Sequence, residues 1–399
     1  MILTLVVLAG VTALLAAAFA REYSETQDTI SRLERARARI AAESGIARGL
    51  AAFVAQDPNL VTQQDDWYTV GNQANDRIVL GSTAFRMQIV DASSLVNVNT
   101  ATEFDLQNLG LSTEQIDSLL DWREEGTTPR TDGAKDEFYN SLAYPYNAGL
   151  RRLDSLEDVL LIKGFTPATL LQAPTESNVT GVTPQPLYAW ATTDSFSPNT
   201  DAQGQQKQNI NNVQANQLQQ AGIPGPVAAA IVARRNTQGP FASMGDVLRV
   251  AGMTVQSATA LVDGFMVGAQ PRNEGRINVN TASENVLTTV AGMTSDVAQA
   301  IVSRQDPGVT TLGELFQVPG YTLEVAQATI DRFTTKSEVF LIRVEGQAGG
   351  SRVPLEAVVS INGGRARVLK VYDPPQSSMI ELWGWPDDTT NDVELGAGQ

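Results

Sequence analysis

The first twenty residues, Met1–Ala20, carry no charge, and charged residues follow at once from Arg21. Twenty apolar residues in a helix measure about 30 Å, which is the thickness of a bilayer core. Apolar residues then recur at helical spacing as far as Gln56, and Asp57-Pro58 ends the pattern. The pattern predicts one long helix, with a transmembrane segment at 1–20 and an amphipathic continuation at 21–56.

A cleavable signal peptide is the alternative for the first segment, because the small residues before Ala20 resemble a cleavage site. Against it, no basic segment precedes the apolar run, and no break separates the run from the following helix. We therefore expect the segment to stay in the protein and to anchor a large body. Whether Met1 is the mature first residue or a start after a missing leader stays open.

Strand-like alternation of apolar and polar residues lies at both ends of the remaining chain. Residues 67–70 and 77–90 show it first, and residues 338–345, 352–361 and 366–372 show it again, with glycine pairs at the predicted turns. We expect one sheet that is split in sequence. Residues 57–95 form its first part and residues 336–373 its last strands, and 374–399 form a tail.

The segment between these parts, residues 96–335, repeats itself three times and predicts an inserted helical domain. Each unit opens with an Asn-x-Asn motif and contains a second shared stretch of eleven residues, at 154–164, 242–252 and 310–320. An apolar helical run links the two stretches and leads to an arginine. The motif asparagines are Asn97, Asn99, Asn209, Asn211, Asn278 and Asn280, and the arginines are Arg123, Arg234 and Arg304.

Local signals indicate that each unit is built from paired helical hairpins. Thr100 and Thr281 are predicted helix caps, each with a glutamate three residues later, and Asn212 is the predicted cap of the middle unit. Three glycines at 164, 252 and 320 are expected at hairpin turns, where a positive φ is needed.

Composition excludes several kinds of function. The chain of 399 residues has no cysteine and no histidine, so disulfides, thiol nucleophiles and Ser-His-Asp catalysis are absent. A metal-dependent hydrolase at clustered carboxylates is the enzymatic option that remains. The net charge of −16 opposes binding to nucleic-acid phosphates, although a local basic patch is still allowed.

An acidic and tyrosine-rich insert lies between Arg123 and Asp154 in the first unit. Carboxylates in such a loop suit calcium, which prefers oxygen ligands, but the acids lack the regular alternation of an EF-hand. A calcium site and a solvated acidic loop are both compatible with this composition.

The Asn-x-Asn segments with paired hairpins resemble the helix-hairpin-helix family. DNA-binding members carry a Gly-hydrophobic-Gly hairpin whose amides face a phosphate, and only the hairpin at Gly222–Gly225 has two glycines here, one residue too far apart. The hairpins are therefore expected to be a packing scaffold. A membrane-anchored DNA receptor of the competence type is the alternative function.

Nearly the whole chain resembles the minor pseudopilin K family of type II secretion systems. The resemblance is carried by the helix at 20–53, by the run at 121–165 with its Trp-acid segment and acidic tyrosine stretch, and by RINVNTASENVL at 276–287. It implies an α+β fold: a pilin-like long N-terminal helix plus an antiparallel sheet, with a large all-α helix-hairpin-helix or SAM-like insertion. The unit at 209–265 is extra to that pattern.

The resemblance also implies a role and partners. It implies a non-enzymatic minor pseudopilin that caps the tip of the pseudopilus and helps to start its assembly, for export of folded proteins across the outer membrane. The implied partners are the minor pseudopilins I and J, the inner-membrane assembly platform and prepilin peptidase. Nucleic acid is not an expected partner. The implied location is the bacterial inner membrane, by a single pass, with the bulk in the periplasm and with N-terminal methylation.

Site residues follow from the same resemblance. The implied membrane and assembly residues are Met1, Leu5, Val7, Leu8, Leu14, Leu15 and Phe19, and the implied calcium ligands are Glu124, Asp132, Asp136 and Glu137. Most pilin-like proteins carry Glu at the fifth position, where it pairs with the N-terminal amine of the neighbouring subunit. Leu5 in its place suits a subunit at the tip, which has no neighbour above it.

Overall fold

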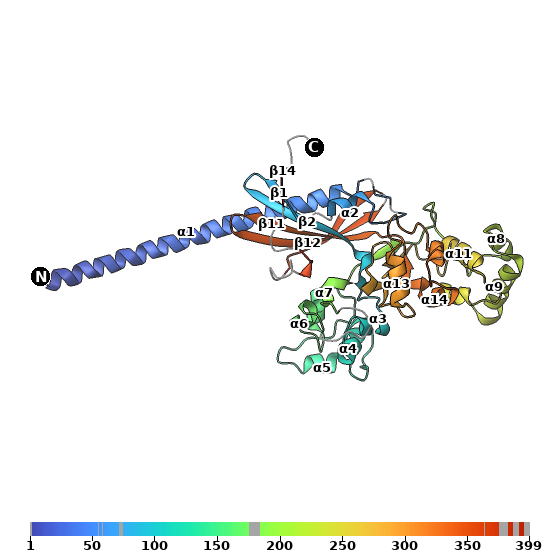
Figure 1. Cartoon of the computed structure of the whole chain (residues 1–399). Coiled ribbons are helices and arrows are strands. Elements are labelled where there is room, and N and C mark those ends of the chain that lie inside the picture. The colour runs from blue at the N-terminus through green and yellow to red at the C-terminus, as the bar shows by residue number, and fades with distance from the viewer. Residues whose placement is uncertain are drawn as a thin grey trace.

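A single helix, α1 (Ile2–Ala51), dominates the shape of the molecule: its first half projects freely and its second half lies on a sheet (Figure 1). The computed structural model describes residues 2–54, 56–57, 59–71, 75–174, 184–362, 364–374, 382–385 and 391–394. The side chains of residues 3, 5–7, 9, 391 and 394 lie outside this description. At 1.5 Å per residue, the 50 residues of α1 span about 75 Å. The predicted long helix is therefore present, and it ends five residues before Gln56.

The main sheet combines strands from both ends of the chain in the order β13-β12-β11-β2-β1-β14. Its strands are β1 (Asp76–Leu80), β2 (Thr83–Asp91), β11 (Val339–Ala348), β12 (Ser351–Asn362), β13 (Arg365–Tyr372) and β14 (Asn391–Glu394). Neighbours are antiparallel, except that β14 runs parallel to β1. The α+β fold class is confirmed. The strand predicted at 67–70 is wrong: this segment is helix α2 (Asp66–Gly71), because burying Trp67 against Phe340 overrides its strand-like alternation.

Small residues allow α1 to approach the sheet closely. Ala38, Ala42, Gly45 and Gly49 follow one another at intervals of four, three and four residues, so they share one face of the helix. A Cβ atom added at Gly45 would lie 2.5 Å from Val344 Cγ1, and one added at Gly346 of β11 would lie 1.9 Å from the Ala38 carbonyl oxygen. Close contact between helix and sheet therefore depends on glycine on both sides.

The opposite face of the sheet carries buried ion pairs. Arg86 of β2 pairs with Glu345 of β11 at 3.0 Å, and both side chains are buried. Arg343 pairs in the same way with Glu356 at 2.8 Å. Two tryptophans of the C-terminal tail cover these pairs: Trp385 lies over the Arg86 guanidinium and Trp383 over that of Arg343.

The inserted segment forms three units, each closed at its base by a short parallel strand pair. The pairs are β3 (Val96–Asn97) with β4 (Ala191–Thr192), β6 (Gln208–Asn209) with β7 (Phe265–Met266), and β9 (Ile277–Asn278) with β10 (Phe333–Thr334). An antiparallel pair, β5 (Phe196–Pro198) with β8 (Arg272–Glu274), lies between the units. The first motif asparagine of each unit therefore stands at the base of its unit.

The helices of the three units share one large apolar core. The first unit contains α3 (Glu103–Asn108), α4 (Thr113–Arg123), α5 (Asp136–Asn140), α6 (Pro167–Leu171) and α7 (Leu187–Trp190). The second contains α8 (Ala215–Gln220), α9 (Gly225–Gln238), α10 (Met244–Leu248) and α11 (Val255–Gly264), and the third α12 (Glu284–Leu287), α13 (Ser295–Val302) and α14 (Leu323–Thr329). Short 3-10 helices lie at Ala92–Ser94, Leu156–Leu161, Leu312–Gln317 and Ile330–Arg332. Figure 1 shows the second and third units beyond the end of the sheet that lies away from the N-terminus, and the first unit beneath the sheet.

The predicted helix caps are wrong by two residues in every unit. The helices that follow the Asn-x-Asn motifs are capped at Thr102, Gln214 and Ser283, rather than at Thr100, Asn212 and Thr281. The displacement arises because each motif forms its own turn first. In the first unit, for example, the Asn97 side chain accepts a hydrogen bond from the Asn99 amide at 2.9 Å. The hairpin glycines at 164, 252 and 320 do adopt the predicted positive φ.

Candidate functional site

The first part of the projecting half of α1, up to Ala20, is an exposed apolar surface. Leu8, Leu14 and Phe19 are 61%, 73% and 67% exposed, and Leu15 is 52% exposed. Of the predicted assembly residues, Met1 and the side chains of Leu5 and Val7 lie outside the described part of the chain, so the interpretation of Leu5 stays a prediction. A contiguous apolar surface of this kind marks a site of contact with another molecule.

Burial on α1 begins abruptly at Ala38, where the helix meets the sheet. Beyond this point the helix packs against β2, β11 and β12, and its buried side chains join the core of the sheet. Ahead of this point, the described chain contacts the helix at Glu34, whose carboxylate accepts the Gly350 amide at 3.1 Å, and the residues before Glu34 are exposed where the structure describes them. Across the described residues, no helix has a stretch both apolar and long enough to cross a bilayer. The transmembrane segment at 1–20 stays a prediction.

The second asparagine of each Asn-x-Asn motif connects the two halves of its unit. The Asn280 side chain donates to the carbonyl of Val309 at 2.9 Å and accepts from its amide at 2.7 Å. Asn211 makes the same pair of bonds with Phe241, and Asn99 with Leu153. Each partner directly precedes the second repeated stretch. The motif is therefore a structural link, and satisfying buried backbone groups explains why asparagine recurs there.

A long polar side chain closes the same turn from the other side. Arg123 donates to the carbonyls of Val98 and Ala101, and Arg235 donates to the equivalent carbonyls of the second unit at 2.9 and 2.8 Å. In the third unit, Gln305 Nε2 donates to the carbonyls of Val279 and Ala282, at 2.9 and 2.7 Å. The sequence aligned Arg123 with Arg234 and Arg304 at the end of each helical run, whereas the side chains that bond the turn carbonyls in the second and third units are those of the next residues, Arg235 and Gln305.

The first asparagine of the third unit joins the insertion to the sheet. Asp91, at the end of β2, is buried and accepts hydrogen bonds from Asn278 Nδ2 at 2.8 Å and Thr281 Oγ1 at 2.7 Å. Burial raises the pKa of Asp91, and these hydrogen bonds oppose that rise. Thr281, expected as a helix cap, therefore serves as a contact between the two parts of the fold.

The acidic insert does not bring its four predicted ligands together. Glu124 pairs with Arg130 at 2.9 Å, and Asp136 accepts the Ala148 amide at 2.8 Å. Asp132 and Glu137 are exposed. In the described part of the chain, no group of three or more acidic side chains is placed to hold a metal ion. Calcium binding stays a prediction, which isothermal titration of the full chain with calcium chloride tests.

An internal lysine that the sequence did not single out holds this insert together. Lys135 is buried, and its Nζ donates to the carbonyls of Asp121 and Glu124, the latter at 2.6 Å. These carbonyls belong to the C-terminal end of α4, where cations are favoured. The insert therefore folds back over the end of α4 around a side-chain ammonium group.

The basic residues of the second unit are engaged by contacts within the protein. The guanidinium of Arg234 lies over the ring of Phe241, 4.4 Å from its centroid, and Arg235 is occupied by backbone carbonyls. Arg249 pairs with Asp246 at 2.9 Å. These contacts leave little cationic surface for a phosphate backbone, which agrees with the expectation of a packing scaffold.

Comparisons with known proteins agree with these features. Residues 90–174 match the family model described as type II secretion system protein K, and residues 203–264 match the helix-hairpin-helix motif. No curated protein matches the sequence. Among solved structures, the chain is similar to one in the crystal structure of the GspK-GspI-GspJ complex from the enterotoxigenic Escherichia coli type 2 secretion system. That match has 12% identity and a TM-score of 0.47, and it covers 90% of this chain and 99% of the other. The predicted resemblance to the protein K family of type II secretion systems is therefore confirmed, through the family match at residues 90–174.

Proposed function

We propose that this chain is a non-enzymatic minor pseudopilin, which caps the tip of a type II secretion pseudopilus and helps to start its assembly. The observation that carries the proposal is the division of α1 into a half packed on the sheet and a half left bare. Such a helix has one face for its own body and a projecting length for neighbouring subunits. The match at residues 90–174 adds the secretion context.

The position of the helical insertion supports a place at the tip. Figure 1 shows the second and third units at the end of the body that lies away from the N-terminus of α1, and the first unit beneath the sheet. If the helices of neighbouring subunits pack side by side with their N-termini at the base, this mass occupies the space above the subunit. A further subunit could not add there, so the chain would end the filament.

We propose the minor pseudopilins I and J as the direct partners, and the inner-membrane assembly platform and prepilin peptidase as further ones. In this arrangement the N-terminal part of α1 lies in the inner membrane and the body lies in the periplasm. Fractionation tests the location: the full chain should sediment with membranes, and a variant without residues 2–33 should not. A full chain that stays in the supernatant would contradict the membrane location.

Co-purification tests the partnership. The full chain should retain the I and J pseudopilins, and the variant without residues 2–33 should retain much less of them. The variant keeps the packed half of α1 from Ala38 onward, so its circular dichroism should still show a folded body. Equal retention by both chains would remove the role proposed for the bare helix.

A DNA receptor is the second candidate, favoured by the helix-hairpin-helix match at residues 203–264. The engagement of Arg234 and Arg235 by contacts within the protein argues against it. Filter binding with duplex DNA at low salt separates the two candidates. True phosphate contacts would give binding that falls steeply as salt rises, whereas the pseudopilin proposal predicts no retention of DNA.

A further inference from the structure

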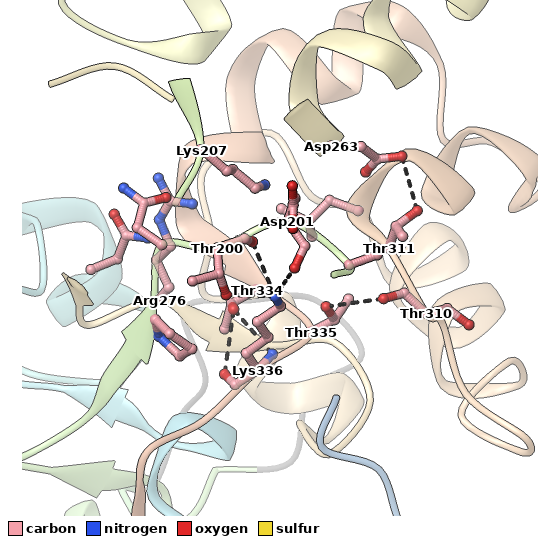
Figure 2. A pocket seen from close by; sticks show the side chains of 15 residues that line it. Thr200, Asp201, Lys207, Asp263, Arg276, Thr310, Thr311, Thr334, Thr335 and Lys336 are labelled. Carbon is pink, nitrogen blue, oxygen red and sulfur yellow. Dashed lines mark hydrogen bonds between the residues drawn. The ribbon is translucent and has the colours of Figure 1, made fainter. Parts of the chain in front are cut away.

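A polar cavity lies where the second and third helical units meet the segment that directly precedes β11, residues 334–336. Its volume is about 400 Å³, part of it open to solvent. The walls come from the loop after β5, from α11, from the segment before β9, and from residues 310–312 and 334–336. Figure 2 shows Lys207 and Arg276 entering from one side, Asp263 and Thr311 from the other, and Lys336 from below.

Two of the charged groups are fully engaged by the protein. Lys336 Nζ donates to Thr200 O, Thr200 Oγ1 and Asp201 O, at 3.0, 2.8 and 2.7 Å. The carboxylate of Asp263 accepts the Gly313 amide at 2.8 Å and the Thr311 hydroxyl at 3.0 Å. These groups shape the cavity and fix its local charge, but they have little capacity left for a ligand.

Two other cations on the wall keep free donors. Lys207 Nζ donates to Val262 O at 2.6 Å, which uses one of its three hydrogens. Within the described residues, the Arg276 guanidinium makes no hydrogen bond or ion pair, so its N–H donors are available to a ligand. Burial lowers the pKa of Arg276, and the nearby carboxylate of Asp331 opposes that change. Both side chains are only partly exposed.

The charge balance of the cavity favours an anion. Its lining contains three cations and two carboxylates, within a chain whose net charge is −16. Burial lowers the pKa of Lys207 to about 8, with Arg276 as the next cause, and burial also lowers the pKa of Lys336 to about 8. At Lys207 the cost of burial therefore outweighs the attraction of the carboxylates of Asp263 and Asp201, and a bound anion would further stabilise its ammonium group.

We propose that Arg276 and Lys207 form a binding site for a small tetrahedral oxyanion, phosphate or sulfate. The planar guanidinium can donate two parallel hydrogen bonds to such an ion, and the ammonium group adds a point charge beside it. The hydroxyl of Thr310, which is exposed on the lining, adds a further hydrogen-bond donor. The bound ion would connect the second unit to residues 334–336, which directly precede β11. This site does not depend on the proposed role in secretion.

Isothermal titration of the full chain with sodium phosphate or sodium sulfate tests the site, with ionic strength held constant by sodium chloride. We expect saturable binding by the wild type and binding about tenfold weaker or more for Arg276→Gln. Arg304→Gln is the matched control. It removes the same charge from an arginine that does not line this cavity. Its affinity should equal that of the wild type.

The thermal unfolding temperature shows whether Arg276→Gln is folded, so that weaker binding is not mistaken for loss of structure. Since Arg276 makes no hydrogen bond or ion pair in the described chain and interacts with Asp331 only through its charge, Arg276→Gln should unfold in chloride buffer close to the wild-type temperature or above it. Phosphate should raise the unfolding temperature of the wild type and of Arg304→Gln, but not that of Arg276→Gln. The proposal is overturned if the wild type shows no saturable binding, if Arg276→Gln binds as tightly, or if acetate competes as well as sulfate.

Discussion

The contact between α1 and the sheet predicts a specific cost for adding one methyl group at Gly346. The Cβ of Gly346→Ala would lie 1.9 Å from the Ala38 carbonyl oxygen and 2.5 Å from the Ala42 amide nitrogen. Both atoms belong to the helix backbone, so no side-chain rotation relieves the contact. The helix must retreat by about 1.5 Å to restore a normal separation, which opens the interface along its small-residue face.

Overpacking of this kind costs about 1–3 kcal/mol. A loss of about 2 kcal/mol in the local stability of α1 corresponds to roughly 30-fold faster amide exchange where opening is local. Hydrogen exchange with mass spectrometry on peptides covering residues 38–51 measures this directly. Peptides from the helical insertion should keep the wild-type rate, because they lie outside the contact.

Gly350→Ala is the matched control on the turn between β11 and β12. Its Cβ would meet only Glu34 Oε2, at the ordinary distance of 3.9 Å. We expect exchange in residues 38–51 to stay at the wild-type rate in this variant. If Gly346→Ala behaves in the same way as Gly350→Ala, the close approach of helix and sheet is not what holds α1 in place.

Three further predictions concern the interior. Asn280→Ala should lower the free energy of unfolding by about 2 kcal/mol, measured by urea titration, because both backbone groups of Val309 lose a buried partner. Glu345→Gln should cost about 3–5 kcal/mol in the same assay, since it leaves the Arg86 charge buried without its anion. Lys207 has a folded-state pKa lowered to about 8, so the folded protein loses this proton before the unfolded chain does. Wild-type stability should therefore rise relative to Lys207→Met by about 1–2 kcal/mol between about pH 8 and pH 9.5, in urea titrations at each pH; a constant difference between the two chains would contradict this assignment.

The sequence predicted the features that depend on local periodicity. The long helix follows from its apolar spacing, the split sheet from alternation at both ends of the chain, and the hairpin turns from glycines such as Gly164. Each of these signals lies within a short window, where backbone geometry alone determines which residues are favoured. The repeated asparagines were also visible as a pattern, although not their role.

What the sequence could not supply depends on partners far away in the chain. The helix caps moved by two residues because asparagine turns precede them, and the contact of Gln305 with the turn carbonyls of Val279 and Ala282 becomes visible only in the folded chain. Lys135 could not be singled out without the fold that buries it. The cavity gathers residues between positions 198 and 336, so no local motif announces it.

Disulfide cross-linking from α1 tests the central claim, that its projecting half is the contact surface for sister subunits. The chain has no cysteine, so one introduced at Leu15, which is 52% exposed, is unique. Tyr144→Cys, at a position 89% exposed in the acidic insert, controls for accessibility alone. With I and J pseudopilins that each carry one cysteine on their own N-terminal helix, we predict cross-links to Leu15→Cys and none to Tyr144→Cys. Equal cross-linking at both positions, or none at Leu15→Cys, would contradict the account.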